Sequence, residues 1–165
     1  MKRFTAIALI AAVMGFSPLT GPAWAFNAAQ VQQLKATKKC PGCDLEGADL
    51  SRLFLNGAAL TGAYLSGAKL TGTRLTGADL SNAGMIKAEL YDAKLDGANL
   101  SGTKLFQAKI SGANLSGANL SNADLGSANL SGANLSGANL SGALLDSATW
   151  TDGSKCSREA IGKCR

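Results

Sequence analysis

The sequence predicts an all-β solenoid in which the chain winds in square coils. Three observations support this: an unbroken five-residue period from Pro41 to Trp150, apolar residues of two fixed sizes within each period, and only 5% aromatic residues. Written in fives from Pro41, the chain gives twenty-two blocks; nineteen end in Leu, and eighteen carry Ala two residues earlier. The exceptions at the Leu positions are Met85, Ile110 and Trp150, and those at the Ala positions are Cys43, Leu53, Thr73 and Thr103.

A period of five fits neither a helix nor a continuous strand. At about 100° per residue, helical leucines five apart would wrap around the whole cylinder. In a strand they would alternate between opposite faces, because five is an odd number. A chain that turns a corner in every block satisfies the pattern, since each side then points one large and one small residue inward. Four such sides close a coil of twenty residues.

The corners should use residues that tolerate positive φ. Gly lies two residues after the Leu position in thirteen blocks, and Asn82, Asp92, Asn122 and Asp152 occupy four of the others. These residue types favour type II-like turns with some variation. The block Ser51–Leu55 carries two extra bulky residues, Leu53 and Phe54, so local irregularity is expected there.

The repeat Ala113-Asn114-Leu115-Ser116-Gly117 and its neighbours resemble the pentapeptide-repeat family, whose motif is Ala-(Asp/Asn)-Leu-x-x. The resemblance covers two-thirds of the chain and implies a right-handed quadrilateral β-helix. Twenty-two blocks at four per coil give about 5.5 coils of this pentapeptide-repeat solenoid. Low-complexity disorder is the alternative for the Ser/Gly/Asn-rich stretch Ser111–Leu140, but disorder gives no reason to keep Leu in phase.

The first 25 residues have the pattern of an export signal. Lys2 and Arg3 precede an apolar stretch from Ala6 to Phe16, and small residues end at Ala23-Trp24-Ala25. The apolar run is too short to span a membrane, so we expect cleavage after Ala25 and no stable membrane insertion. The protein is therefore expected in the periplasm, or in the thylakoid lumen if the source is cyanobacterial.

The remaining chain divides into a capping helix (26–40), the solenoid (41–150) and a C-terminal cap (151–165). Asn27 and Gln30 have the spacing of a capping box. Ala28, Val31 and Leu34 are expected to form the apolar face that covers the first coil. At the other end Trp150 should fill the last layer, and the tail is expected to hold one helical turn around residues 158–161.

The four cysteines lie in the two caps and are expected to form disulfides, because the predicted compartment is oxidising. The solenoid separates the caps by roughly 26 Å at about 4.8 Å per coil, far beyond the distance that a disulfide bridges. Cys40 should therefore pair with Cys43, and Cys156 with Cys164. The Cys-Pro-Gly-Cys opening and the closing Cys-x7-Cys resemble those of exported cyanobacterial pentapeptide proteins. The alternative for Cys40 and Cys43 is a redox dithiol.

Charge and composition argue against several classes of function. The net charge of +5 falls to +3 without Lys2 and Arg3, and no dense Lys/Arg stripe marks a nucleic-acid site. The sequence has no His. No catalytic, metal-binding or cofactor-binding residues are predicted, and the protein is expected not to be an enzyme.

Outward residues twenty apart should stack into ladders. The predicted ladders are Lys69/Glu89/Lys109, Asn99/Asn119/Asn139 and Asn114/Asn134. One outward cluster is more apolar and is the predicted contact patch for an unknown protein partner: Ile86, Lys87, Tyr91, Phe106, Gln107 and Lys109. The alternative is that these are ordinary exposed residues of a loose corner.

Three functions are compatible with these features. A structural or protein-interaction scaffold is favoured, and a thiol-disulfide redox protein using Cys40 and Cys43 is the second hypothesis. Gyrase inhibition by DNA mimicry occurs among pentapeptide-repeat proteins, but it requires a strongly acidic surface, and this chain is basic.

Overall fold

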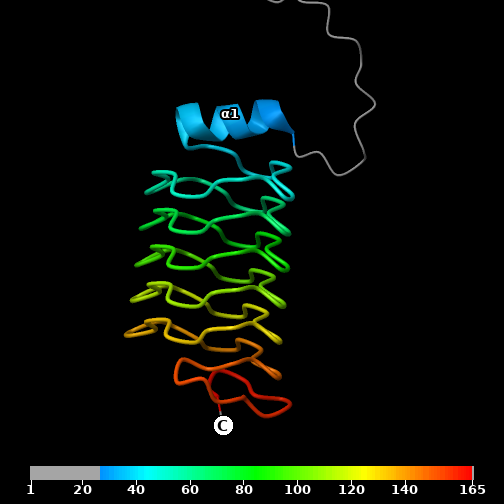
Figure 1. The fold of residues 1–165 in the computed structure, drawn as a ribbon, viewed down its shortest axis with the longest axis vertical. Helices are drawn as coiled ribbons and strands as arrows, with labels where there is room; N and C mark the ends of the chain where they lie inside the picture. Colours follow the sequence, from blue (N-terminus) through cyan, green and yellow to red (C-terminus); the bar gives the residue numbers. More distant parts are fainter. Residues whose placement is uncertain (1–26, 165) are drawn as a thin grey trace, which may run out of the picture.

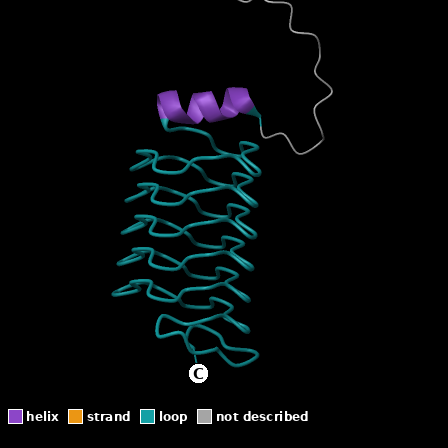
Figure 2. Ribbon diagram, in the orientation of Figure 1, coloured by secondary structure: helices purple, strands orange, loops and turns teal. Residues whose placement is uncertain are grey.

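The chain forms a straight stack of square coils with a helix across one end (Figure 1). A computed structural model describes residues 27–164, and the predicted signal (1–25) lies outside these residues. Helix α1 spans Ala28–Thr37. The solenoid itself consists of turns and single-residue parallel β-bridges, which Figure 2 draws as loops.

The bridges confirm the twenty-residue coil. Tyr64 pairs with Asp44 above it and with Gly84 below it, and the same parallel pairing runs from Lys39↔Ala59 to Asn129↔Thr149. The leucines that end the blocks from Leu45 to Leu130 also donate their backbone N–H to the coil below; Leu70, for example, bonds the carbonyl of Glu89 at 2.7 Å. Pairing between coils therefore holds the stack together in place of long strands.

The corners are more uniform than the sequence predicts. The second residue of every block from Pro41 to Trp150 has positive φ, including Arg52, Lys87 and Gln107 at 58° each. The Ala48 N–H donates to the Leu45 carbonyl across a corner at 3.1 Å, as in a type II turn. The expected irregularity at Ser51–Leu55 is wrong for the backbone, which keeps the same turn and bridge. Hydrogen bonding between coils therefore overrides the φ preference of the individual corner residues.

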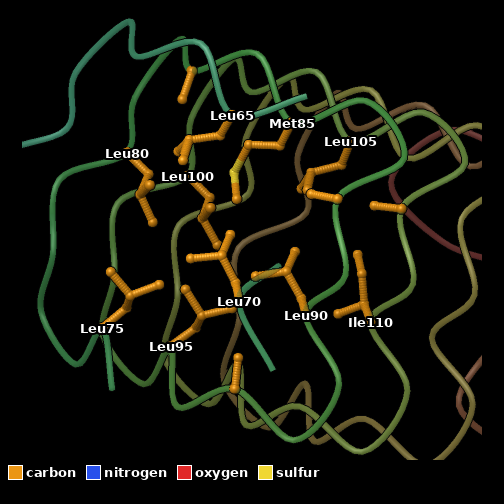
Figure 3. Close-up of a cluster of buried hydrophobic side chains, with 14 of the residues drawn as sticks. Leu65, Leu70, Leu75, Leu80, Met85, Leu90, Leu95, Leu100, Leu105 and Ile110 are labelled. Atoms are coloured by element: carbon orange, nitrogen blue, oxygen red, sulfur yellow. The ribbon is translucent and has the colours of Figure 1, made fainter. Parts of the chain in front are cut away.

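Large apolar side chains fill the interior (Figure 3), and the repeat alanines are buried with them. Leu65, Met85 and Leu105 lie above one another, and almost every Leu and Ala of the repeat is fully buried. Thr73 and Thr103 replace two alanines and are also buried, but each hydroxyl donates to a backbone carbonyl at 2.7 Å. The core therefore tolerates a hydroxyl only where an acceptor lies within reach.

Helix α1 covers the first coil. The Asn27 side chain accepts the N–H groups of Ala29 and Gln30, which confirms it as the N-cap. The reciprocal half of the capping box is wrong, because the Gln30 side chain instead accepts the N–H of Asp44 in the first coil at 2.6 Å. Val31 and Leu34 are buried as predicted, whereas Ala28 is exposed.

The C-terminal tail folds back as an antiparallel strand-like segment. Lys155 pairs with Thr149, and Ile161 pairs with Leu144. The expected helical turn at 158–161 is therefore wrong; the tail instead satisfies backbone groups of the last coil. Trp150 is half-buried and packs against the core.

Both predicted disulfides are present. Cys40 and Cys43 have Cα atoms 5.3 Å apart, and Cys156 and Cys164 have Cα atoms 4.8 Å apart. Each bridge closes a loop within its own cap, so neither ties the two ends together.

The asparagine ladders form as predicted, and each is headed by a carboxylate. Asn119 donates its side-chain amide to Oδ1 of Asn99 at 3.3 Å, and Asn99 donates to Oδ1 of Asp79 at 3.2 Å. The second ladder runs from Asn134 through Asn114 to Asp96. Hydrogen bonds from Ser81, assisted by those from Thr61 and Asn99, lower the pKa of Asp79.

Ala118→Phe should destabilise the solenoid by about 3 kcal/mol, because Ala118 is fully buried and a ring there would push the coils apart. Urea unfolding followed by circular dichroism measures the change. Ser116→Phe is the matched control, since Phe106 naturally occupies the same repeat position. Equal stability of the two variants would contradict the inward assignment of Ala118.

Asp79→Asn should weaken the acid dependence of stability. A carboxyl whose folded pKa is lowered stabilises the fold above its unfolded pKa, and this contribution disappears as the pH falls through the folded pKa. The difference in urea midpoint between wild type and Asp79→Asn should therefore shrink below about pH 4. Asp146→Asn controls for the loss of one negative charge. A difference that stays constant down to pH 2 would contradict the role of Asp79.

Candidate interaction surface

Ile86 and Phe106 lie at the same corner of successive coils, as the sequence predicts. The Lys87 N–H donates to the Phe106 carbonyl at 3.0 Å, which fixes the two corners one above the other. The side chain of Ile86 is 37% exposed and that of Phe106 is 39% exposed. Both apolar groups therefore reach solvent although each covers part of the coil beneath it.

A shallow groove runs along this corner above Ile86. It has a volume of about 480 Å³ and is lined by Glu46, Gly47, Ser66, Gly67, Ile86 and Lys87. Gly47, Ser66 and Gly67 form half of its lining, and Glu46 contributes a carboxylate at the same corner of the first coil. Ile86 closes the lower end, so a side chain in the groove would contact both backbone and an apolar wall.

Phe106 is held in place by the coil below. An added Cβ at Gly126 would lie 3.0 Å from Cδ2 of Phe106, so the ring packs directly over Gly126. Gly126 is buried under it. The absence of a side chain at this position allows the ring to lie against the solenoid.

Tyr64 extends the apolar surface and was missed in the sequence analysis. Its side chain is 57% exposed in the middle of the adjoining side, and Gly84, its bridge partner, leaves the space below it open. Tyr64 precedes a Leu, a position that the repeat directs outward, so its position in the repeat was the available signal. We call Tyr64, Ile86 and Phe106 together the apolar corner surface.

The other predicted patch residues are only partly brought together. Lys87 and Gln107 share the corner of Ile86 and Phe106. Tyr91 is half-buried at the next corner, so a full side of the coil separates it from them. Lys109 lies on the side between these two corners, and its Nζ donates to Oε1 of Glu89 at 2.9 Å. The hydrogen bond to Glu89 and the negative charge of Glu89 raise the pKa of Lys109.

Phe54 is a second exposed aromatic residue, on the opposite side of the coil. It lies ten residues, or half a coil, before Tyr64, and its ring is 64% exposed. The Arg74 guanidinium lies 4.7 Å from the centre of the ring, an arrangement typical of a cation–π contact. Phe54 therefore has a partner within the chain.

The environment of Cys40 and Cys43 differs from that of a redox dithiol. Both residues are buried, and they follow the C-terminal end of α1, whose C-cap is Lys38. A reactive thiolate is favoured at a helix N-terminus, where the helix dipole stabilises negative charge, and in an exposed position. This location favours a structural disulfide.

The described residues show neither a metal cluster nor a membrane span. Within residues 27–164, no group of three or more His, Cys, Asp or Glu side chains lies close enough to hold a metal ion. No helix in the same part of the chain is both long and apolar enough to cross a membrane.

The chain is similar to several known proteins. The family model for pentapeptide repeats matches with eight copies, over residues 39–77, 63–102, 74–112 and 108–146. No curated protein matches. Among solved structures, the pentapeptide repeat protein Rfr23 from the cyanobacterium Cyanothece 51142 is 32% identical, with a TM-score of 0.72, over 74% of this chain and 97% of Rfr23.

A second match is HetL, a pentapeptide repeat protein involved in heterocyst differentiation regulation, from the cyanobacterium Nostoc sp. strain PCC 7120. It is 39% identical over 71% of this chain and 61% of HetL, with a TM-score of 0.37. The repeat, the coil geometry and the match to Rfr23 agree. The chain therefore belongs to the pentapeptide-repeat family, whose members fold as right-handed β-helices.

Proposed function

We propose that this protein is an exported, non-enzymatic scaffold that binds a protein partner through the apolar corner surface. The observation that carries the proposal is an exposed Ile86 that lines the groove, with Phe106 exposed at the same corner of the next coil and Tyr64 exposed on the adjoining side of the coil above. Most other outward positions hold Ser, Gly, Asn or charged residues. A cluster of exposed aromatic and aliphatic groups on a polar surface is typical of a protein contact site.

The charges around the surface indicate what the partner should carry. Lys87 and Lys104 are exposed beside Ile86 and Phe106, whereas the nearby Lys109 is already paired with Glu89. A partner of suitable chemistry would place an apolar side chain in the groove and carboxylates opposite Lys87 and Lys104. Its association rate should then fall as salt rises.

The proposed export rests on the N-terminal sequence and the disulfides. Disulfides form and persist in oxidising compartments such as the periplasm, and all four cysteines are paired. Together with the signal pattern of residues 1–25, this supports the periplasm, or the thylakoid lumen of a cyanobacterium, as the location. The net charge of +3 after cleavage argues against a DNA mimic.

Replacing Ile86 and Phe106 with Ser should weaken capture of the specific partner at least about tenfold, because apolar anchors at the centre of an interface contribute most of the binding energy. The measurement is a quantitative pull-down from the native compartment with wild-type and variant protein. Circular dichroism confirms that the variant remains folded.

Phe54→Ser is the control, since it removes an even more exposed ring from the opposite side of the coil. A partner retained by Phe54→Ser but lost by the Ile86/Phe106 variant supports the proposal. An identical set of captured proteins for wild type and both variants would remove the apolar corner surface as a binding site.

A further inference from the structure

The groove along the corner of Ile86 carries opposite charges at its two ends. Glu46 lies at the end nearer α1, in the first coil, and Lys87 lies at the other end, in the third coil. Both residues are exposed. Because neighbouring coils are one strand spacing apart, these residues are separated by roughly 10 Å along the axis. The groove is therefore charged at both ends, with the Ile86 side chain as an apolar wall.

The middle of the groove is open because two glycines form its floor. The Gly47 N–H donates to the Ser66 carbonyl at 2.9 Å, and the Gly67 N–H donates to the Ile86 carbonyl at 2.9 Å. These bonds hold the three corners one below another. An added Cβ at Gly47 or Gly67 would meet nothing within 4 Å. A side chain of a partner therefore has room over the glycines, beside Ile86.

Neither charge of the groove is paired within the described part of the chain. Among residues 27–164 the one ion pair joins Lys109 and Glu89, and the side chains of Glu46 and Lys87 have no hydrogen-bond partner there. A partner that covers the groove removes water from both ends. Because an ion buried without a partner is costly, the covering segment must supply the opposite charge at each end.

The adjoining side of the coil shows the same order of charges. Its outward column consists of Asp44, Tyr64, Gly84 and Lys104, one coil apart, as their parallel bridges show. Asp44 and Lys104 are exposed, and three coils, or roughly 14 Å, separate them. An acid near α1, then an apolar group, then a base therefore occurs in two neighbouring columns.

The side on the other flank of the corner lacks this order. Its outward column alternates in sign: Asp49, Lys69, Glu89 and Lys109. Alternating charges give no direction along the axis, and the last two are already paired with each other. The separation of charge therefore belongs to the corner and to the side of Tyr64.

We propose that the apolar corner surface binds an extended segment of its partner with a basic, an apolar and an acidic residue in this order, starting from α1. The basic side chain faces Glu46. The apolar side chain lies over Gly67 and against Ile86, and the acidic side chain faces Lys87 and Lys104. This inference rests on the proposed function of the same surface and adds the chemistry of the partner.

An extended segment has the spacing that the surface requires. Alternate residues of an extended chain point to the same face, so the pattern basic–x–apolar–x–acidic directs all three side chains toward the solenoid. Four residues of extended chain rise about 13 Å. That length lies between the separations of the charges in the two columns, roughly 10 Å and 14 Å.

A segment that carries carboxylates alone fits this surface less well. It would place one carboxylate opposite Glu46, with Asp44 nearby, and like charges brought together disfavour binding. The acids of the first coil therefore select against a purely acidic segment, while Lys87 and Lys104 select against a purely basic one.

Three short peptides with a central Leu test the order of charges. Their cores are Lys-Ser-Leu-Ser-Glu (mixed), Lys-Ser-Leu-Ser-Lys (basic) and Glu-Ser-Leu-Ser-Glu (acidic). Each is titrated into isotope-labelled protein recovered after expression of the full chain, and NMR shifts of the Gly47, Gly67 and Lys87 amides give the site and the Kd. Wild type should bind the mixed peptide at least about threefold more tightly than the others, a factor typical of one exposed ion pair.

Two charge reversals should move this preference in opposite directions. Glu46→Lys makes both ends of the groove basic and should favour the acidic peptide, whereas Lys87→Glu should favour the basic peptide. Asp146→Lys is the matched control for the first, because Asp146 occupies the same position of the same corner in the last coil. Lys94→Glu is the control for the second. Both controls should keep the wild-type preference for the mixed peptide.

The outcomes separate this inference from the proposed function. A wild-type preference for the acidic or basic peptide, or equal binding of all three, would overturn the order of charges. So would the absence of shifts at these amides up to about 2 mM peptide. Shifts that grow with protein concentration alone would place a second copy in the groove and would also overturn it. In each case the apolar corner surface keeps its own test, the pull-down with serine at Ile86 and Phe106.

Discussion

The constant cross-section of the coil is the constraint on which the rest of this structure depends. Backbone pairing requires every coil to lie one strand spacing from the next, about 4.8 Å. That spacing is kept only if each layer buries the same volume, so a large residue must alternate with a small one at every side. Even the exceptions obey this limit. Met85 and Ile110 are close to Leu in size, and the buried hydroxyls of Thr73 and Thr103 donate to the backbone carbonyls of Leu50 and Leu100.

The same pairing decides the backbone conformation at the corners. Arg52, Lys87 and Gln107 adopt positive φ, which costs roughly 1 kcal/mol or more for a residue with a Cβ. A corner in any other conformation would break hydrogen bonds to both neighbouring coils. The coil therefore imposes its geometry on these residues, and they are free to vary in side chain because they point to solvent. This division explains how apolar groups gather at Ile86 and Phe106 without disturbing the fold.

The features set by the repeat could be predicted from sequence, whereas most contacts that occur once, at the ends, could not. Period and residue size determined the coil, the inward residues and the asparagine ladders, and the length of the solenoid restricted the cysteines to local pairs. The uniformity of the corners could not be predicted from the φ preferences of single residues, because those preferences do not include the hydrogen bonds between coils. The partner of Gln30 and the path of the tail depend on contacts made once, at the ends, where no period exists. The exposure of Tyr64 depends on Gly84 in the coil below, which leaves its ring uncovered, and a single repeat does not contain that neighbour.

The apolar corner surface lies along the corner between the sides that include Tyr64 and Lys69. Its backbone is bonded to the coils on both sides, since the Gly67 N–H donates to the Ile86 carbonyl and the Lys87 N–H donates to the Phe106 carbonyl. Ile86 and Phe106 therefore keep a separation of one coil whatever their side chains contact. A scaffold of this form presents its apolar groups at intervals that the coil sets, whereas a loop would have to become ordered on binding.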